Sequence, residues 1–420
     1  MHGRDDISRL LVEEVAVAHV EPVFDAIGRL ESTVDGVYLV GGAVRDVLLG
    51  AESFDVDIVV EGDGIAFARA LAGLLDARFT PHAKFGTAIV HHGGDARVDV
   101  VTARSERYHA PAMLPTVERA TIEEDLRRRD FTINAMAVSL RRRDFGHLVD
   151  PFRGRDDLEQ GVIRVLHDVS FVDDPTRIFR AVRYEARFGF RLDAHSEQRA
   201  RASVADGHLD DLTPARLTAE LEALFDEPCA APAIPRLGEL GVGRALHPLL
   251  RTDGEGAGIF ARARGLAEEY GIGVPAWRIG IEVVARELPA LEVGQWVERL
   301  ELRRRDADLV VGAIANAPTI VERLRGGVLT QAEIVDIASV SDPDAALLAL
   351  AVSDLSALRD YFERLRNVRL EIGGDELAEL GLAESPRVGE ILAEIRRRKL
   401  NGELERRDEE LAAARELVSA

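Results

Sequence analysis

The chain has 420 residues, of which 46% are hydrophobic and 30% charged, and its formal net charge is −21. This composition indicates a globular protein of two to four domains, and its longest apolar run, 345–352, is too short to cross a bilayer. One cysteine excludes an internal disulfide framework and a cysteine-based zinc site. The N-terminus is charged and mostly acidic, unlike a signal or transit peptide, so we expect a cytoplasmic protein.

Mixed α and β elements are predicted in the first 150 residues. A helix over 5–31 precedes a strand over 36–40, a turn at two glycines and a helix that Gly50 ends. A strand over 54–61 and a helix over 64–77 follow. Two strands over 87–92 and 97–103 are then joined by a hairpin signal. Because no βαβ pattern continues beyond this point, a small mixed sheet is predicted rather than a large parallel one.

Helices dominate the sequence after residue 150. Arginine-rich helices are predicted over 173–190 and 213–226, and Pro and Gly clusters separate the helices that follow. The last unit, 373–418, predicts short helices and one long charged helix. The predicted fold class is therefore α+β, with a small mixed-sheet head followed by an all-helical remainder.

Gly41 and Gly42 stand between a predicted strand and a predicted helix. Glycine lets the backbone approach an anion, and the free N–H groups at a helix start face it, so this turn suits phosphate. The segment is neither a Walker A loop nor the dinucleotide fingerprint G-x-G-x-x-G. A purely structural turn explains the same two residues equally well.

Asp55 and Asp57 lie two apart in the apolar run "FDVDIVV", so a strand presents both carboxylates on one face. Two such carboxylates can hold Mg²⁺, which prefers oxygen ligands and removes the repulsion between them. Asp99, on another predicted strand, could supply a third carboxylate. Three carboxylates and a phosphate turn together favour two-metal nucleotidyl transfer. The alternative is an exposed edge strand with solvated carboxylates.

Five segments of the sequence stand out: "LVGGAVRDVLLG…FDVDIVVEGDG", "DVVTARSERY", "EDLRRRDFTINAMA", "LVDPFRGRDDLEQGVIRVLHD" and "FVDDPTRIFRAVRYEARFGF". Together they resemble one family, the class II tRNA nucleotidyltransferases and bacterial poly(A) polymerases, and the resemblance implies a polymerase-β-like head. They occur in the family's order over residues 36–226. The tail from Gly373 matches related bacterial enzymes more loosely.

This resemblance implies the roles of individual residues. Asp55 and Asp57 would hold two Mg²⁺ ions that activate the RNA 3′ hydroxyl and neutralise the triphosphate. Asp99 is the candidate third catalytic carboxylate on the strand pattern alone. Gly41, Gly42 and Arg45 are implied to contact the triphosphate. Arg128, Arg129 and Asp130 are implied to contact the ribose and phosphates of the nucleotide, with Asn134 close to them in the nucleotide-binding site. A solvated helix face would explain the run "RRR" as well.

The segment "DDPTR" is implied to read the incoming base. Asp174 and Arg177 would share one face of a helix that Pro175 begins, and one of the two adjacent aspartates would cap that helix. A carboxylate accepts from the exocyclic amine of C or A, whereas the carbonyl oxygens of U and G would be repelled. Arg180 and Arg183 follow at three-residue steps and form a ridge suited to phosphate.

The implied function is Mg²⁺-dependent, template-independent addition of C and A to the 3′ end of tRNA from CTP and ATP. Enzymes that add only A or only CC remain alternatives, and the neck and tail resemble A-adding relatives at least as closely. A poly(A) polymerase is disfavoured by the acidic C-terminus. A non-catalytic RNA-binding protein is disfavoured because the acidic and arginine motifs are intact.

Four domains are predicted: a catalytic head (1–150), a helical neck that reads the base (151–226), a helical body (227–340) and a tRNA-binding tail (341–420). The net charge alone argues against a nucleic-acid partner, although it does not report how charge is distributed. In the tail, the basic run 396–399 suits either tRNA contact or a salt-bridged surface helix.

Overall fold

The computed structural model describes residues 21–50, 56–82, 86–92, 97–107, 112–113, 115–341, 343–382 and 385–419. The chain divides into two compact units, Met1–Leu212 and Thr213–Ala420. The finer division into head, neck, body and tail remains a prediction. Among the described helices, none combines the length and the apolar character that crossing a membrane requires.

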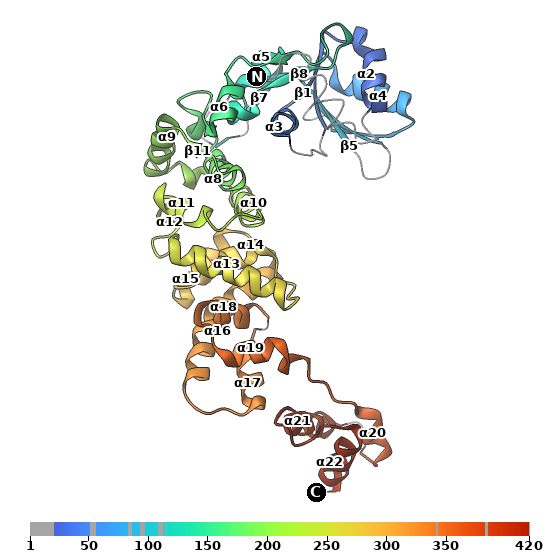
Figure 1. The fold of residues 1–420 in the computed structure, drawn as a ribbon, viewed down its shortest axis with the longest axis vertical. Coiled ribbons are helices and arrows are strands. Elements are labelled where there is room, and N and C mark those ends of the chain that lie inside the picture. The colour runs from blue at the N-terminus through green and yellow to red at the C-terminus, as the bar shows by residue number, and fades with distance from the viewer. Residues whose placement is uncertain are drawn as a thin grey trace. The chain divides into compact units, whose positions relative to one another are not determined.

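A mixed sheet forms the centre of the first unit (Figure 1). Within the described residues its strand order is β3-β4-β5-β2-β1-β8-β9. The strands are β1 (Gly36–Val40), β2 (Val56–Glu61), β3 (Arg78–His82), β4 (Thr87–His91), β5 (Arg97–Thr102), β8 (Ala137–Ser139) and β9 (Leu148–Val149). Neighbouring strands are antiparallel except β2 and β5, which run parallel with Asp57 beside Asp99.

Helices cover both faces of this sheet. On one side α4 (Gly64–Leu75) packs against β4, β5 and α2 (Glu21–Leu30) (Figure 1). On the other, the apolar cluster around Val59 includes residues of α5 (Ile122–Arg127). Since side chains alternate along a strand, Asp57 shares the face of Val59 and therefore lies on the α5 side.

The structure confirms the α+β class and most elements predicted for the head. The strand over 36–40, the helix that Gly50 ends as α3 (Gly42–Leu49), and the two strands of the hairpin are all present. The first part of the helix over 5–31, residues 54–55 and the hairpin turn lie outside the described residues. Strands β3, β8 and β9 and the separate ribbon of β6 (Arg104–Arg107) and β7 (Thr116–Arg119) were not predicted, because each is short and lacks a clear alternation.

The arginine-rich helix predicted over 173–190 is present from Thr176 to Phe188, and a short helix that was not predicted precedes it. Asp174 adopts an extended conformation and separates α7 (Ser170–Asp173) from α8 (Thr176–Phe188). A residue before proline is biased away from the helical region, which explains the break at Pro175. The rest of this part of the unit consists of η3 (Thr132–Asn134), α6 (Gly154–Gln160), β10 (Val162–Ile163), β11 (Arg191–Leu192) and α9 (Ala194–Ala205).

The second unit is helical throughout its described residues. Its first helices are α10 (Pro214–Phe225), α11 (Ala233–Glu239), α12 (Val242–Leu246), α13 (Gly254–Glu269), α14 (Ala276–Ala285), α15 (Ala290–Arg299) and α16 (Arg304–Arg325). They continue as α17 (Gln331–Ala338), α18 (Asp344–Ser353), α19 (Ser356–Glu363), α20 (Gly374–Glu379), α21 (Pro386–Leu400) and α22 (Arg407–Ser419). The last three enclose a small apolar core of their own.

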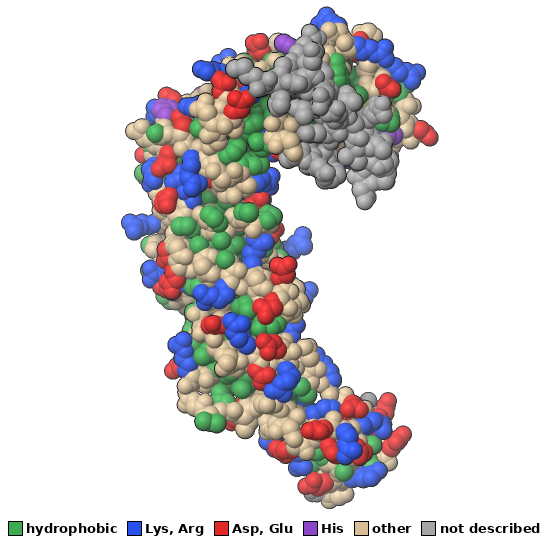
Figure 2. Space-filling view, viewed as in Figure 1, with side chains coloured by type: hydrophobic (Ala, Val, Ile, Leu, Met, Phe, Trp, Pro, Cys, Tyr) green, Lys and Arg blue, Asp and Glu red, His purple; other side chains and the backbone are tan. Residues whose placement is uncertain are grey.

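The basic run of the tail is largely paired within the chain. Arg397 and Arg398 both contact Glu394, and Lys399 contacts Glu410 at 2.5 Å. Figure 2 shows acidic and basic side chains interspersed on this part of the surface. For these three residues the structure therefore favours a salt-bridged surface helix over the alternative of tRNA contact.

Candidate functional site

One cavity of about 420 Å³ in the first unit gathers most of the residues singled out from the sequence. Its lining is Gly41, Gly42, Arg45, Asp57, Glu106, Arg128, Arg129, Asp130, Asn134, Asp174, Arg177, Arg180 and Tyr184. Of these, Glu106 and Tyr184 were not predicted. The lining carries five guanidinium groups and four carboxylates, which gives a formal charge of +1 in a chain whose total is −21. The cavity is therefore basic relative to the molecule and suits an anionic ligand.

The glycine turn places the start of α3 against the arginines of the cavity. Gly41 has φ +67°, and a Cβ there would lie 2.6 Å from Nη1 of Arg129. Its backbone N–H donates to the carbonyl of Met136 at 3.2 Å. Only glycine combines this left-handed backbone with so close an approach of a guanidinium group.

Asp125 holds two arginines of the cavity in place. Its side chain is fully buried and accepts from Nε and Nη2 of Arg128, at 3.0 and 2.8 Å, and from Nη2 of Arg129 at 3.0 Å. It also accepts the backbone N–H of Arg104 at 3.2 Å. Two arginines of the run "RRR", Arg128 and Arg129, are thus fixed from behind by one carboxylate, whereas Arg127 is exposed. Sequence reasoning missed Asp125, although its spacing of three and four residues from the arginines was a signal.

Asp130 connects the head to α8. Its two oxygens accept from Arg180, at 2.9 and 2.6 Å, from the amide of Asn134 at 3.0 Å and from the backbone N–H of Phe131 at 2.8 Å. Burial opposes ionisation of this carboxyl, but Arg180, Asn134 and Arg177 outweigh it and lower its pKa below the ordinary value. Asp130 is therefore an ionised group with four donors, which orients Arg180 within the cavity.

Arg45 also bridges α3 and α8. Its guanidinium donates to Asn134 Oδ1 at 2.7 Å and to Asp46 at 2.9 Å. It lies over the rings of Tyr184 and Phe188, with centroids 5.5 and 4.7 Å away. These aromatic contacts were not predicted. They show that Arg45, which is 4% exposed, packs between the turn and α8 as well as lining the cavity.

Of the two residues implied to read a base, Asp174 lies at the break between α7 and α8, and Arg177 lies in the first turn of α8. Asp174 accepts from the backbone N–H and the hydroxyl of Thr176, the first residue of α8, at 3.0 and 2.6 Å, whereas the N-cap position itself is Pro175. Arg177 is buried, and its Nη1 and Nη2 donate to Ser170 Oγ at 2.5 Å and to the carbonyl of Arg128 at 2.9 Å. Both side chains are thus held in fixed orientations in the cavity wall.

The carboxylates expected to bind metal lie at the sheet. Asp57 lines the cavity, and Asp99 stands beside it on the parallel strand β5, so both side chains face one side. Asp55 lies outside the described residues. Oδ1 of Asp99 is buried without a hydrogen-bond partner in the described structure, and Nε of Arg97 is 3.8 Å from Oδ2. Adjacent carboxylates with an unsatisfied oxygen fit a divalent cation, although no cluster of three metal-binding side chains occurs among the described residues.

Of the predicted residues that the structure describes, two do not line the cavity. Asp99 stands next to it in register with Asp57. Arg183 lies on α8 with its guanidinium 5.8 Å from the ring centroid of Tyr184. The expected ridge of three arginines therefore contributes Arg177 and Arg180 to the cavity wall, while Arg183 packs on the aromatic ring.

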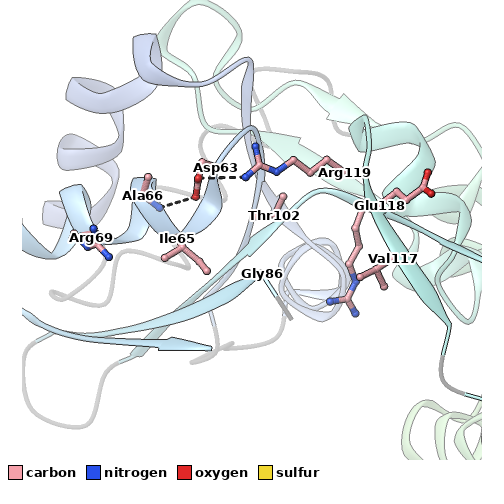
Figure 3. Close-up of a pocket in the computed structure, with 10 residues that line it drawn as sticks. Asp63, Ile65, Ala66, Arg69, Gly86, Thr102, Val117, Glu118 and Arg119 are labelled. Carbon is pink, nitrogen blue, oxygen red and sulfur yellow. Dashed lines mark hydrogen bonds and ion pairs between the residues drawn. The ribbon is translucent and has the colours of Figure 1, made fainter. Parts of the chain in front are cut away.

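A second cavity of about 440 Å³ lies between α4 and the ribbon of β6 and β7. Figure 3 shows Asp63 between the start of α4 and Arg119 of β7. Its carboxylate accepts the N–H of Ala66 at 3.0 Å and contacts Arg119 at 3.3 Å. The helix start is thus already capped from within the chain.

Comparison with known families locates the match in the head. A family model described as the poly A polymerase head domain matches residues 37–164. This range contains the glycine turn, Asp57, Glu106 and the segment of Asp125 to Asn134 that line or support the cavity.

Among curated proteins, the A-adding tRNA nucleotidyltransferase of Geobacter sulfurreducens is 36% identical, over 91% of this chain and 45% of that protein. The chain thus spans less than half the length of this relative. The A-adding enzyme of Halalkalibacterium halodurans is 32% identical, and the CC-adding enzyme of Deinococcus radiodurans 33%, each over 91% of this chain and 89% of the relative.

Solved structures match along the whole chain. A CCA-adding enzyme in an apo form superposes with a TM-score of 0.85 at 36% identity, covering 97% of both chains. The Thermotoga maritima CCA-adding enzyme complexed with tRNA superposes with a TM-score of 0.83 at 33% identity, again covering 97% of both.

Proposed function

This chain belongs to the tRNA nucleotidyltransferase family, and we propose that within it the chain is an A-adding enzyme that attaches the terminal adenosine to tRNA from ATP. The A-adding relatives of Geobacter and Halalkalibacterium, each aligned over 91% of this chain, support this choice of nucleotide. The observation that carries the proposed site is the cavity that joins Asp57, the glycine turn and Arg177. We assign the reaction to the cytoplasm.

In this proposal the neck selects the base. Thr176 holds one oxygen of Asp174, and Ser170 and the Arg128 carbonyl hold Arg177, so an acceptor and a donor are presented in fixed positions. Adenine offers an exocyclic amine to the carboxylate and a ring nitrogen to the guanidinium. Uracil and guanine would bring a carbonyl oxygen towards the carboxylate, which costs binding energy.

The phosphates would lie against the glycine turn and the arginines. The N-terminus of α3 and the guanidinium groups of Arg128 and Arg129 line the same cavity as Asp57. Positive charge here stabilises the triphosphate and the charge that develops during transfer. Tyr184 and Arg45 would form the wall towards the neck.

Enzymes of this family work with a divalent metal ion, and we propose that this chain uses Mg²⁺. Asp57 of β2 and Asp99 of β5 are the residues that would hold it, together with Asp55, which precedes Asp57 by two positions in the sequence. When bound, the metal would neutralise the triphosphate and lower the pKa of the RNA 3′ hydroxyl. The unpartnered oxygen of Asp99 supports this donor set.

The proposal is tested by incorporation assays with purified protein and Mg²⁺. Three tRNA transcripts, one lacking CCA, one ending in C and one ending in CC, are each offered ATP, CTP or both. We expect extension of the CC-ended transcript only, by one nucleotide and only with ATP. Asp57→Asn serves as the inactive control, because it removes a charge from the expected metal site.

A different pattern would identify a different enzyme of the family. The CCA-adding enzymes that superpose at 36% and 33% identity make complete CCA addition the second candidate, and the 33% identity to the Deinococcus CC-adding enzyme makes CC addition the third. Addition of two C residues to the shortest transcript would indicate that activity. Full CCA on the shortest transcript would overturn the A-adding proposal in favour of a complete CCA-adding enzyme.

A further inference from the structure

Glu106 is an acidic side chain inside a cavity that suits an anion. It lies on β6, lines the cavity, and its side chain is 8% exposed. Oε1 accepts from Nη1 of Arg128 at 2.8 Å and from Nη2 and Nε of Arg104 at 3.1 and 3.3 Å. The proposed reaction gives this carboxylate no role.

Glu106 is not needed to orient Arg128. Nε and Nη2 of that guanidinium already donate to Asp125, and Nε also donates to the carbonyl of Arg104 at 3.1 Å. Asp125 is fully buried and fixed, so the plane of the guanidinium is set from behind. The remaining nitrogen, Nη1 of Arg128, donates its hydrogen bond to Glu106.

A carboxylate on this nitrogen stands where a phosphate chain would bind. Both are anions that seek the same donor, and at a separation of a few ångströms they repel each other. We propose that Glu106 is an internal counter-ion, which pairs with Arg128 until a nucleotide binds and gives way to the triphosphate of that nucleotide. This inference rests on the proposed function of the cavity as a nucleotide site.

The structure provides a partner for Glu106 after displacement. Arg104 does not line the nucleotide cavity and instead lines the second cavity beside the ribbon. When a phosphate takes Nη1 of Arg128, Glu106 keeps its ion pair with Arg104 and is not left as an uncompensated buried charge. Nucleotide binding is thereby coupled to the position of β6, which carries both residues.

Direct binding measurements test the counter-ion. Calorimetry without tRNA or divalent metal compares the full-length protein with Glu106→Gln, using ATP, inorganic tripolyphosphate and adenosine as probes. Removing one negative charge beside the phosphate site should tighten binding of ATP and tripolyphosphate by about fivefold. The affinity for adenosine, which has no phosphate, should not change.

Glu118→Gln is the matched control. Glu118 is an exposed residue of the partner strand β7, in register with Ser105, and it points away from Asp63 in Figure 3. The substitution Glu118→Gln removes one negative charge from the same ribbon at a residue that does not contact Arg128. Binding of all three probes should therefore stay at the wild-type level. The thermal unfolding midpoint of each variant establishes that it is folded. If Glu106→Gln does not fold, Glu106→Ala replaces it and should also tighten binding.

Unchanged or weaker binding of tripolyphosphate and ATP by folded Glu106 variants would overturn the counter-ion and make Glu106 a residue that only positions Arg128. Equal tightening by Glu118→Gln would also overturn it, because the effect would then come from total charge. The tripolyphosphate arm does not depend on the base or on tRNA. It can therefore support the counter-ion even if the transcripts fail to accept adenosine, so the two proposals fail separately.

Discussion

At the scale of single residues, buried carboxylates fix the positions of the arginines in the proposed site. Asp125 and Asp130 together bind the guanidinium groups of Arg128, Arg129 and Arg180. An arginine side chain has many rotamers, and an ion pair behind it removes that freedom before a ligand arrives. The affinity of the site should depend on these supports as well as on the groups that touch the ligand.

Replacing Asp125 by asparagine should therefore damage both binding and stability. Loss of the charge leaves two guanidinium groups without their buried partner, which should cost about 3 kcal/mol of folding free energy. We expect KM for ATP to rise about tenfold, with a smaller change in kcat, as measured by steady-state incorporation and urea unfolding. Glu123→Gln on the exposed face of α5 is the control and should change neither. A wild-type KM in Asp125→Asn would contradict a supporting role.

Arg177→Ala should reduce discrimination between nucleotides more than it reduces turnover of ATP. The substitution removes the donor expected to read the base edge, and leaves the proposed phosphate contacts in place. Misincorporation of UTP and GTP relative to ATP should rise about tenfold in assays with single nucleotides. Arg187→Ala, an exposed position of the same helix, should keep wild-type fidelity. Unchanged fidelity in Arg177→Ala would remove the base-reading assignment.

At the scale of elements, the turn before α3 is the most constrained connection near the cavity. Its geometry depends on a left-handed residue that also meets a guanidinium group. Local sequence predicted the turn itself, since a strand, two glycines and a helix are a recognisable succession. The packing of Arg129 against the turn comes from a segment almost 90 residues later and could not be predicted locally.

Gly41→Ala should lower stability and activity, whereas Gly73→Ala should raise stability. At position 41 the left-handed backbone costs a side chain about 1–2 kcal/mol, and the new Cβ displaces Arg129. At position 73, inside α4, a Cβ meets open space, and alanine favours the helix by about 0.5–1 kcal/mol. Thermal unfolding and incorporation rates of both variants check this pair. Equal stabilities would contradict the constraint on Gly41.

At the scale of the whole molecule, the two units have different kinds of buried charge. In the first, buried acids pair with arginines around a cavity. In the second, Glu282 of α14 lies beside Asp344 of α18 and Arg278, which itself contacts Asp344 at 2.5 Å and Asp306 at 3.0 Å. Burial, and then the charge of Asp344, raises the pKa of Glu282 well above 4.5.

The second unit should therefore lose stability as pH rises. Above pH 4.5 the unfolded chain releases the Glu282 proton while the folded chain retains it, so unfolding becomes more favourable by about 1.4 kcal/mol per pH unit until the folded pKa is reached. Both tryptophans, Trp277 and Trp296, belong to this unit, so their fluorescence reports its unfolding by urea. Glu282→Gln should remove this part of the pH dependence.

The exposed Glu298→Gln serves as the control and should keep the wild-type slope. A slope that is the same in Glu282→Gln and in the wild type would show that another group causes the pH dependence.

The sequence by itself determined the α+β class, the order of the main elements and the segments that line the cavity. These are local properties, since periodicity, glycine and proline positions and contiguous motifs are readable without knowing which strand pairs with which. Eleven of the predicted residues line one cavity, because the contiguous motifs that carry them were identified as units.

Only the tertiary structure decided which side chains support those motifs. The parallel pairing of β2 with β5 skips two intervening strands and sets Asp57 beside Asp99. Glu106 reaches Arg128 across 22 residues, and Tyr184 meets Arg45 across a far longer stretch. Such contacts depend on packing between segments that are distant in the sequence. The charge balance of a buried site follows from that packing, whereas composition gives only the net charge of the whole chain.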